Sequence, residues 1–177
     1  MSAGKAPTAD RIADENEMML RRQREFRLAA EYVASAFAEF EAVRKVVLFG
    51  SVARPLKKEI PRFKKYRRAR QAILRECKDV DLAVWLSGLS LLQRLQRAKG
   101  RALNGLFEER EIGVVHHQVD VFLMEPASDR YLSRLCTFGE CPKGKPECYV
   151  KDCGATSFLR QHGDFVFKRE ALSPAAS

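Results

Sequence analysis

The sequence of 177 residues has no apolar run that approaches the roughly 20 residues needed to cross a bilayer. Its N-terminal stretch, MSAGKAPTADRIADENE, has no apolar core and is acidic, which is unlike a secretory signal. Internal repeats and low-complexity tracts are also absent from the sequence. We therefore expect a cytoplasmic protein without a membrane partner, whose thiols stay reduced.

The composition is that of a globular protein, with 46% hydrophobic and 31% charged residues. Most of its net charge of +9 is concentrated in one stretch, residues 57–78. Ten cations and two acids give that stretch a charge of +8, which favours RNA or an acidic protein as partner. The cations are Lys57, Lys58, Arg62, Lys64, Lys65, Arg67, Arg68, Arg70, Arg75 and Lys78, and the acids are Glu59 and Glu76.

The hydrophobic periodicity predicts an α/β (α+β) fold, in which one mixed sheet is flanked by helices. Phe26, Val33 and Phe37 illustrate the helical spacing. Helices are expected at about 12–43, 58–76 and 89–107, and strands at 46–49, 80–86 and 114–124. As domains, we predict a disordered N-terminus at 1–10, a domain at 11–127 with a basic helical insertion at 55–78, and a C-terminal extension at 128–177.

Two aspartates stand two residues apart at the start of the strand predicted at 80–86. Side chains two apart in a strand share a face, so Asp79 and Asp81 point to one side while Val80 and Leu82 point into the core. Two neighbouring carboxylates repel each other, and a divalent cation with oxygen ligands removes that cost. A solvated strand end is the alternative interpretation of this pair.

A third aspartate, Asp120, is the one acidic residue in the apolar run from 119 to 124. On an adjacent strand it would join Asp79 and Asp81 in a two-metal site for nucleotidyl transfer. A single aspartate in a strand is also typical of a salt-bridge partner.

A glycine and a serine follow the first predicted strand, at Gly50 and Ser51. Glycine allows the backbone to approach a phosphate closely, and the serine hydroxyl and local amides can donate to it. Arg54 lies within reach of the same phosphates and would neutralise their charge. Such a pair is also common in ordinary turns.

The motifs LFGSVAR at 48–54, DVDL at 79–82 and VDV at 119–121 together resemble the DNA polymerase beta superfamily, in particular the minimal nucleotidyltransferases of bacteria and archaea. The resemblance covers about residues 45–125. It implies a palm-like sheet, an NTP cosubstrate with ATP as first choice, and Mg²⁺ or Mn²⁺. By position, Gly50 and Ser51 would bind the triphosphate, Asp79 and Asp81 a metal, and Asp120 would be metal ligand or general base. The insertion before Asp79 is longer than is usual in this family.

Four of the five cysteines fall within residues 136–153. Four thiolates can close a tetrahedral structural zinc site, so we predict a small C-terminal zinc knuckle. Unligated thiols and disulfides are the alternatives. The four residues are Cys136, Cys141, Cys148 and Cys153.

The sequence as a whole predicts an enzyme that moves an NMP, AMP first, from an NTP to a hydroxyl of a protein or RNA. A protein acceptor would resemble antitoxin-type members of the family, which modify a partner toxin. The alternative is a catalytically inactive module that binds nucleotide or nucleic acid.

Overall fold

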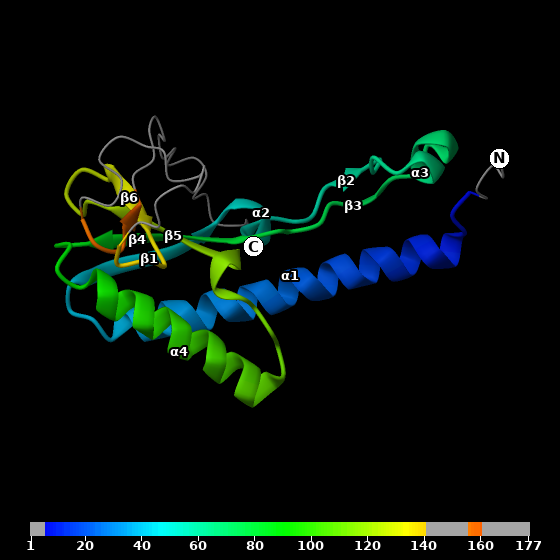
Figure 1. Ribbon diagram of the computed structural model, residues 1–177. Coiled ribbons are helices and arrows are strands. Elements are labelled where there is room, and N and C mark those ends of the chain that lie inside the picture. The colour runs from blue at the N-terminus through cyan, green and yellow to red at the C-terminus, as the bar shows by residue number, and fades with distance from the viewer. Residues whose placement is uncertain (1–5, 141–155, 161–177) are drawn as a thin grey trace.

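The computed structural model describes residues 6–140 and 156–160 (Figure 1). Its helices and strands alternate in the order expected of a mixed α/β protein. They are α1 (Ala9–Ala38), β1 (Val43–Phe49), α2 (Gly50–Ala53), β2 (Lys58–Glu59), α3 (Lys64–Ala69), β3 (Ile73–Leu74), β4 (Val80–Leu86), α4 (Leu92–Arg110), η1 (His116–Gln118), β5 (Val119–Met124), β6 (Tyr131–Leu135) and β7 (Leu159–Arg160).

Five strands form one mixed sheet in the order β1-β4-β5-β6-β7. Only β4 and β5 are parallel, and the other neighbouring pairs are antiparallel. Parallel neighbours need a crossover, and α4 supplies it between β4 and β5. The prediction of one mixed sheet with helices is confirmed, and β6 and β7 extend that sheet beyond residue 127.

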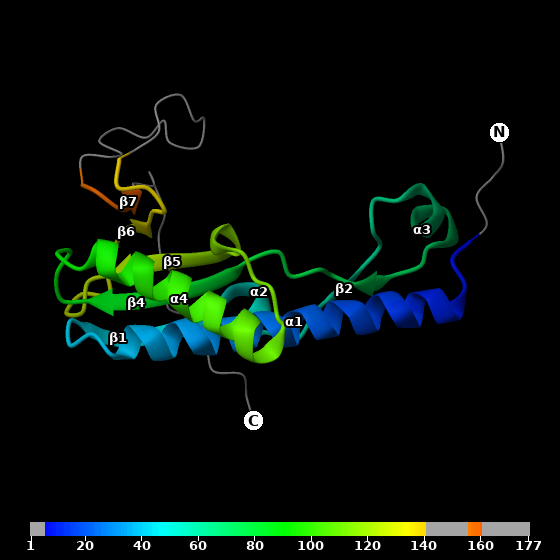
Figure 2. The ribbon, with the colours of Figure 1, turned by 60° about the horizontal axis from the view of Figure 1, so that its bottom comes forward.

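Helices α1 and α4 contact each other and cover the same face of the sheet (Figures 1 and 2). The main hydrophobic core lies between these helices and the sheet, and the spacing seen in the sequence correctly predicted the inward positions. From the helices come Phe26, Val33, Phe37, Leu95, Leu103 and Leu106, and from β4 come Val80, Leu82 and Val84.

The opposite face of the sheet carries a smaller aromatic cluster, in which Phe49, Trp85 and Phe122 are buried with Ala83 and Met124. The rings of Phe49 and Phe122 meet edge to face, with their centroids 5.2 Å apart. Because side chains alternate along a strand, the residues next to this cluster on the same face are Asp81 and Asp120. The fold therefore places both carboxylates on the face that the helices leave uncovered.

The prediction of one basic helix over 58–76 is wrong. The segment is an arm in which β2 pairs with β3, and only α3 at its tip is helical (Figure 1). Pro61 disfavours helix around it, and Arg70 ends α3 in a left-handed conformation with φ of 51°. Like charges at helical spacing would also have repelled one another along a longer helix.

The arm runs beside the N-terminal half of α1 in both views (Figures 1 and 2). Buried Tyr66 donates a hydrogen bond to Glu15, and the Leu74 amide donates to Asn16 Oδ1 at 2.7 Å. Arg22 of α1 lies 3.6 Å from a Glu76 carboxylate oxygen. These contacts fix the direction of the arm relative to the sheet.

Several predicted boundaries shift. Helix α1 begins at Ala9, inside the stretch predicted to be disordered, because Thr8 caps it by accepting from the Arg11 amide at 3.3 Å. Residues 1–5 lie outside the described ones. The strand expected at 114–124 begins only at Val119, because η1 occupies the three preceding residues.

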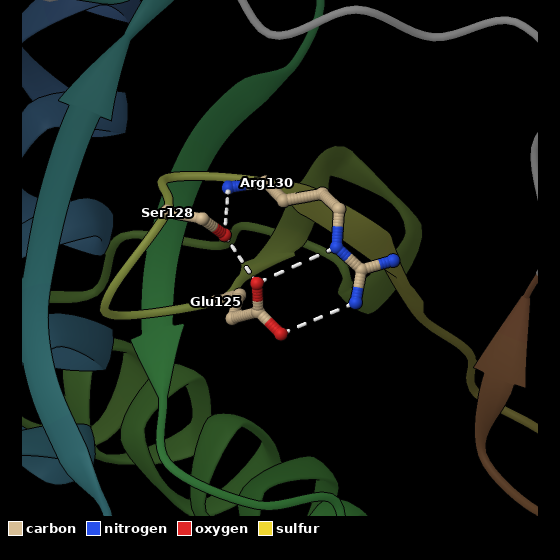
Figure 3. Close-up of polar contacts among 3 residues, drawn as sticks. All are labelled: Glu125, Ser128 and Arg130. Atoms are coloured by element: carbon tan, nitrogen blue, oxygen red, sulfur yellow. Dashed lines mark hydrogen bonds and ion pairs between the residues drawn. The ribbon is translucent and has the colours of Figure 1, made fainter.

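A short turn joins β5 to β6 (Figure 3). It follows Met124, whereas Asp120 lies near the other end of β5. Arg130 donates to both oxygens of Glu125, with Nη2 3.1 Å from Oε1, and Ser128 donates to the same carboxylate. This closed turn sets the antiparallel return that brings β6 beside β5.

None of the helices within the described part of the chain has the length and apolar character needed to cross a membrane.

Candidate active site

The residues of the candidate site lie in one row across three strands. Strand register places Asp81 of β4 between Phe49 of β1 and Asp120 of β5. Asp79 directly precedes β4 and is exposed. The structure thus brings two of the predicted carboxylates to neighbouring positions, as the sequence suggested.

Position 50 requires a glycine, because the Asp81 side chain lies against it. Gly50 adopts φ of +75°, a conformation that other residues rarely take. A Cβ atom on Gly50 would lie 2.3 Å from Asp81 Oδ2, which is far inside van der Waals contact. Room for a phosphate at this glycine stays a prediction, whereas the structure shows that Gly50 makes room for the Asp81 carboxylate.

Helix α1 holds the short helix α2 through two long side chains. The Gln23 amide nitrogen donates to the carbonyl oxygens of Ser51, Val52 and Arg54, at 3.3, 3.2 and 2.5 Å. Arg27 Nε donates to the Val52 carbonyl at 2.9 Å. Gln23 is buried, so these bonds satisfy carbonyls that the four-residue helix leaves without internal partners.

A cavity of about 430 Å³ lies where this turn meets the carboxylates and the base of the arm. Its walls bring together the predicted phosphate-binding residues Gly50, Ser51 and Arg54 with Asp79 and Asp81. The base of the arm completes the lining with Pro55, Leu56, Lys57, Arg75, Glu76 and Lys78. Cations that can bind phosphate and carboxylates that can bind a metal therefore line the same cavity.

The Asp81 carboxyl is electrostatically strained. Burial, and after it the neighbouring Asp79 carboxylate, raise its pKa to about 6, against a smaller opposing effect of Arg134. Two carboxylates together with substrate phosphates form the donor set that Mg²⁺ usually takes in proteins. Asp79 and Asp81 fit such a cation, because its charge would offset the cost of burying the Asp81 carboxylate and the repulsion between the two carboxylates.

Asp120 has a different environment. Its carboxylate forms an ion pair with Arg134 of β6, whose guanidinium also stacks 5.1 Å from the Phe122 ring centre. Within residues 6–140 and 156–160, no three His, Cys, Asp or Glu side chains are grouped so that they could hold a metal ion. Asp79 and Asp81 are therefore the candidate metal ligands, and Asp120 is a salt-bridge partner in this conformation.

Asp120 lines a second cavity of about 440 Å³, whose wall also includes Asp79. Asp79 thus borders both cavities, with the Gly-Ser turn in the first and Asp120 in the second. The site consists of two adjoining spaces that meet at one carboxylate.

The zinc prediction falls largely outside the described residues. Cys141, Cys148 and Cys153 lie outside the described residues. Cys136 is a half-buried free thiol just after β6.

No family model matches the sequence, and comparisons with curated proteins and with solved structures gave no match either.

Sequence reasoning missed four residues of the site, namely Gln23, Lys99, Arg134 and Arg160. Gln23 and Lys99 sit on buried faces of amphipathic helices, and a polar residue at an apolar position is the signal that could have found them. Arg134 and Arg160 lie in a region interpreted as an extension, so their place beside Asp120 was not foreseeable.

Proposed function

We propose that the protein is a Mg²⁺-dependent nucleotidyltransferase that moves an NMP, AMP first, from an NTP to a hydroxyl of RNA or protein. The observation that carries this proposal is the cavity in which a Gly-Ser turn with nearby cations faces Asp79 and Asp81. Phosphates and a divalent cation are the ligands that satisfy both sets of groups at once.

In the proposed reaction, the acceptor oxygen attacks the α-phosphorus of the NTP. A new P–O bond forms there, the bond between the α-phosphorus and its bridging oxygen breaks, and pyrophosphate leaves. Asp120 takes the hydroxyl proton and passes it to water. Gly50 and Ser51 donate to the triphosphate, while Arg54 neutralises its charge. Magnesium held by Asp79 and Asp81 would polarise the α-phosphate and stabilise the leaving pyrophosphate.

The arm supports RNA as the acceptor within this proposal. Its cations are mostly exposed, and its base, with Lys57 and Lys78, lines the cavity that would hold the triphosphate. Phe63 near the tip is 68% exposed, as is suited to stacking on a base. An RNA backbone lying on the arm would therefore lead toward the reacting phosphate.

Labelled nucleotide tests the proposal directly. The full chain is incubated with each α-labelled NTP, Mg²⁺, total RNA and cell protein, and the fractions are separated. Label is expected in RNA or protein with the native chain, and none with Asp79→Asn combined with Asp81→Asn. Asp14→Asn, an exposed change on α1, should transfer label normally. Absence of label from every fraction would refute the proposed transferase activity.

A non-catalytic module is the second candidate, and the Asp120–Arg134 ion pair favours it, because that pair occupies the proposed base. Equilibrium dialysis with labelled ATP and Mg²⁺ separates the two functions. Bound ATP without transfer in the previous assay identifies a binding module, whereas bound ATP with transfer identifies the enzyme.

Gln23→Leu should loosen the Gly-Ser turn. The substitution removes the Gln23 donor from the Ser51, Val52 and Arg54 carbonyls, of which Val52 keeps Arg27, so we expect a loss of about 1–3 kcal/mol in the free energy of unfolding. It should also weaken ATP binding by about tenfold, because the turn amides are no longer held in place.

Thermal unfolding and ATP titration measure these two effects. The matched control is Gln93→Leu, at an exposed position of α4. Reduced stability with native ATP affinity would show that Gln23 has a structural role only.

A further inference from the structure

Three cations and two carboxylates line the second cavity. Lys99 of α4, Arg134 of β6 and Arg160 of β7 all line it, against the acids Asp79 and Asp120. Arg134 and Arg160 are partners in the register of β6 and β7, so both point to the face that carries Asp120. The sheet therefore places two carboxylate-bearing strands beside two arginine-bearing strands.

Lys99 is the most enclosed of these cations, with only 2% of its surface exposed. Its ammonium donates to the carbonyl oxygens of His116 and Val119, at 3.3 and 3.1 Å. In the part of the chain that the structure describes, it has no carboxylate partner. A lysine has three donors, so one remains for a ligand in the cavity.

The cations of this cavity destabilise one another. Burial, followed by the charge of Arg134, lowers the pKa of Lys99 to about 8. Burial, followed by the charge of Arg160, also lowers the pKa of Arg134. Arg134 already pairs with Asp120, whereas the described residues give buried Lys99 only carbonyl partners, so an anion in the cavity would offset the cost of burying the Lys99 charge.

We propose that this cavity binds a phosphate group of the acceptor, next to the hydroxyl that Asp120 deprotonates. The inference rests on the proposed function. It requires an acceptor that carries a phosphate close to the reacting hydroxyl, and so admits a small phosphorylated alcohol beside RNA. The phosphate would take charge-assisted hydrogen bonds from Lys99 and Arg160, while the NTP occupies the first cavity. The end of an RNA chain and a small phosphorylated alcohol both have this chemistry.

Binding is tested on the full chain by calorimetry in metal-free, nucleotide-free buffer. The probes are glycerol 3-phosphate, glycerol, and a uridine trinucleotide with a free 3′-hydroxyl. We expect both phosphate-bearing probes to bind and glycerol not to bind. Tighter binding of the trinucleotide that Lys99→Met weakens identifies an RNA end in this cavity, and equal binding of the two probes identifies a small acceptor.

Two substitutions test the cations separately, so that a folding defect in one does not remove the test. Lys99→Met and Arg160→Gln should each weaken the phosphate-bearing probes by about tenfold, because each removes a charge-assisted bond. Arg97→Met, an exposed change two residues from Lys99 on α4, should leave the affinity unchanged.

Three results would overturn the inference. They are no binding of either phosphate probe, equal binding by the native chain and both variants, and loss of probe binding when ATP and Mg²⁺ saturate the protein. The last result would assign the cavity to the NTP. Because the first binding measurement contains no NTP and no metal, its result does not depend on whether the protein transfers label. Phosphate binding without label transfer would refute only the proposed transferase activity. Label on an acceptor that has no phosphate would refute only the proposed phosphate site.

Discussion

Asp81→Asn should make the metal-free protein more stable while it abolishes nucleotidyl transfer. The pKa of Asp81 in the folded chain is about 6, above its ordinary 3.8, so the folded state favours the protonated carboxyl. The protonated Asp81 carboxyl contributes fully to the stability of the fold below pH 3.8, and this contribution is lost as the pH rises to about 6. Above that pH, the charged carboxylate costs at most about 3 kcal/mol, and the neutral amide removes this cost.

Thermal unfolding at pH 7.5 measures this effect. For a chain of this size, a gain of 1 kcal/mol raises Tm by about 2–4 °C. At pH 4 the difference between Asp81→Asn and the native chain should shrink, because the native carboxyl is then mostly protonated in the folded state. Asp14→Asn, at an exposed position, should not change Tm appreciably at either pH.

Magnesium should reverse the order of stability. The cation binds the native pair Asp79 and Asp81 and stabilises the folded chain by mass action, whereas the variant lacks one ligand. A Tm of Asp81→Asn equal to or below that of the native chain without metal, together with no Mg²⁺ effect on either, would argue against a metal site here.

Removing the charge from the outer arm should weaken RNA binding on the order of a hundredfold at about 0.1 M salt. The reason is release of counterions from the RNA, which each phosphate contact drives. Losing four contacts should lower the slope of log K against log salt by about 3, at roughly 0.7 per contact for a single strand. The variant carries glutamine at Arg62, Lys64, Arg67 and Arg68, which are exposed and lie outside both cavities.

A charge-matched variant provides the control for the arm. It replaces four exposed arginines elsewhere with glutamine, and it should keep the native salt slope. Fluorescence anisotropy with a labelled single-stranded RNA at several salt concentrations measures both variants. An equal loss in both would mean that the binding follows net charge and not the arm. The control positions are Arg24, Arg44, Arg97 and Arg101.

Local patterns identified the elements on which the site is built. The alternation around Asp81 and the three- and four-residue spacing of Phe26, Val33 and Phe37 each depend on neighbours in the chain, and the structure confirms both. The arm was misread because its charge and its lack of glycine are compatible with a helix. The pairing of Lys58 with Leu74 joins residues too far apart for local periodicity to detect.

The sequence by itself determined the mixed α/β class, the strand that carries Asp81 and directly follows Asp79, the turn at Gly50 and the concentration of charge in residues 57–78. Each of these is a property of a short segment. Only the tertiary structure decided what the segments meet. It placed Asp81 against Gly50, paired Asp120 with Arg134, and buried Lys99 beside them. Such contacts depend on strand order and register, which arise from burial of the whole sheet and which the spacing within one segment does not specify.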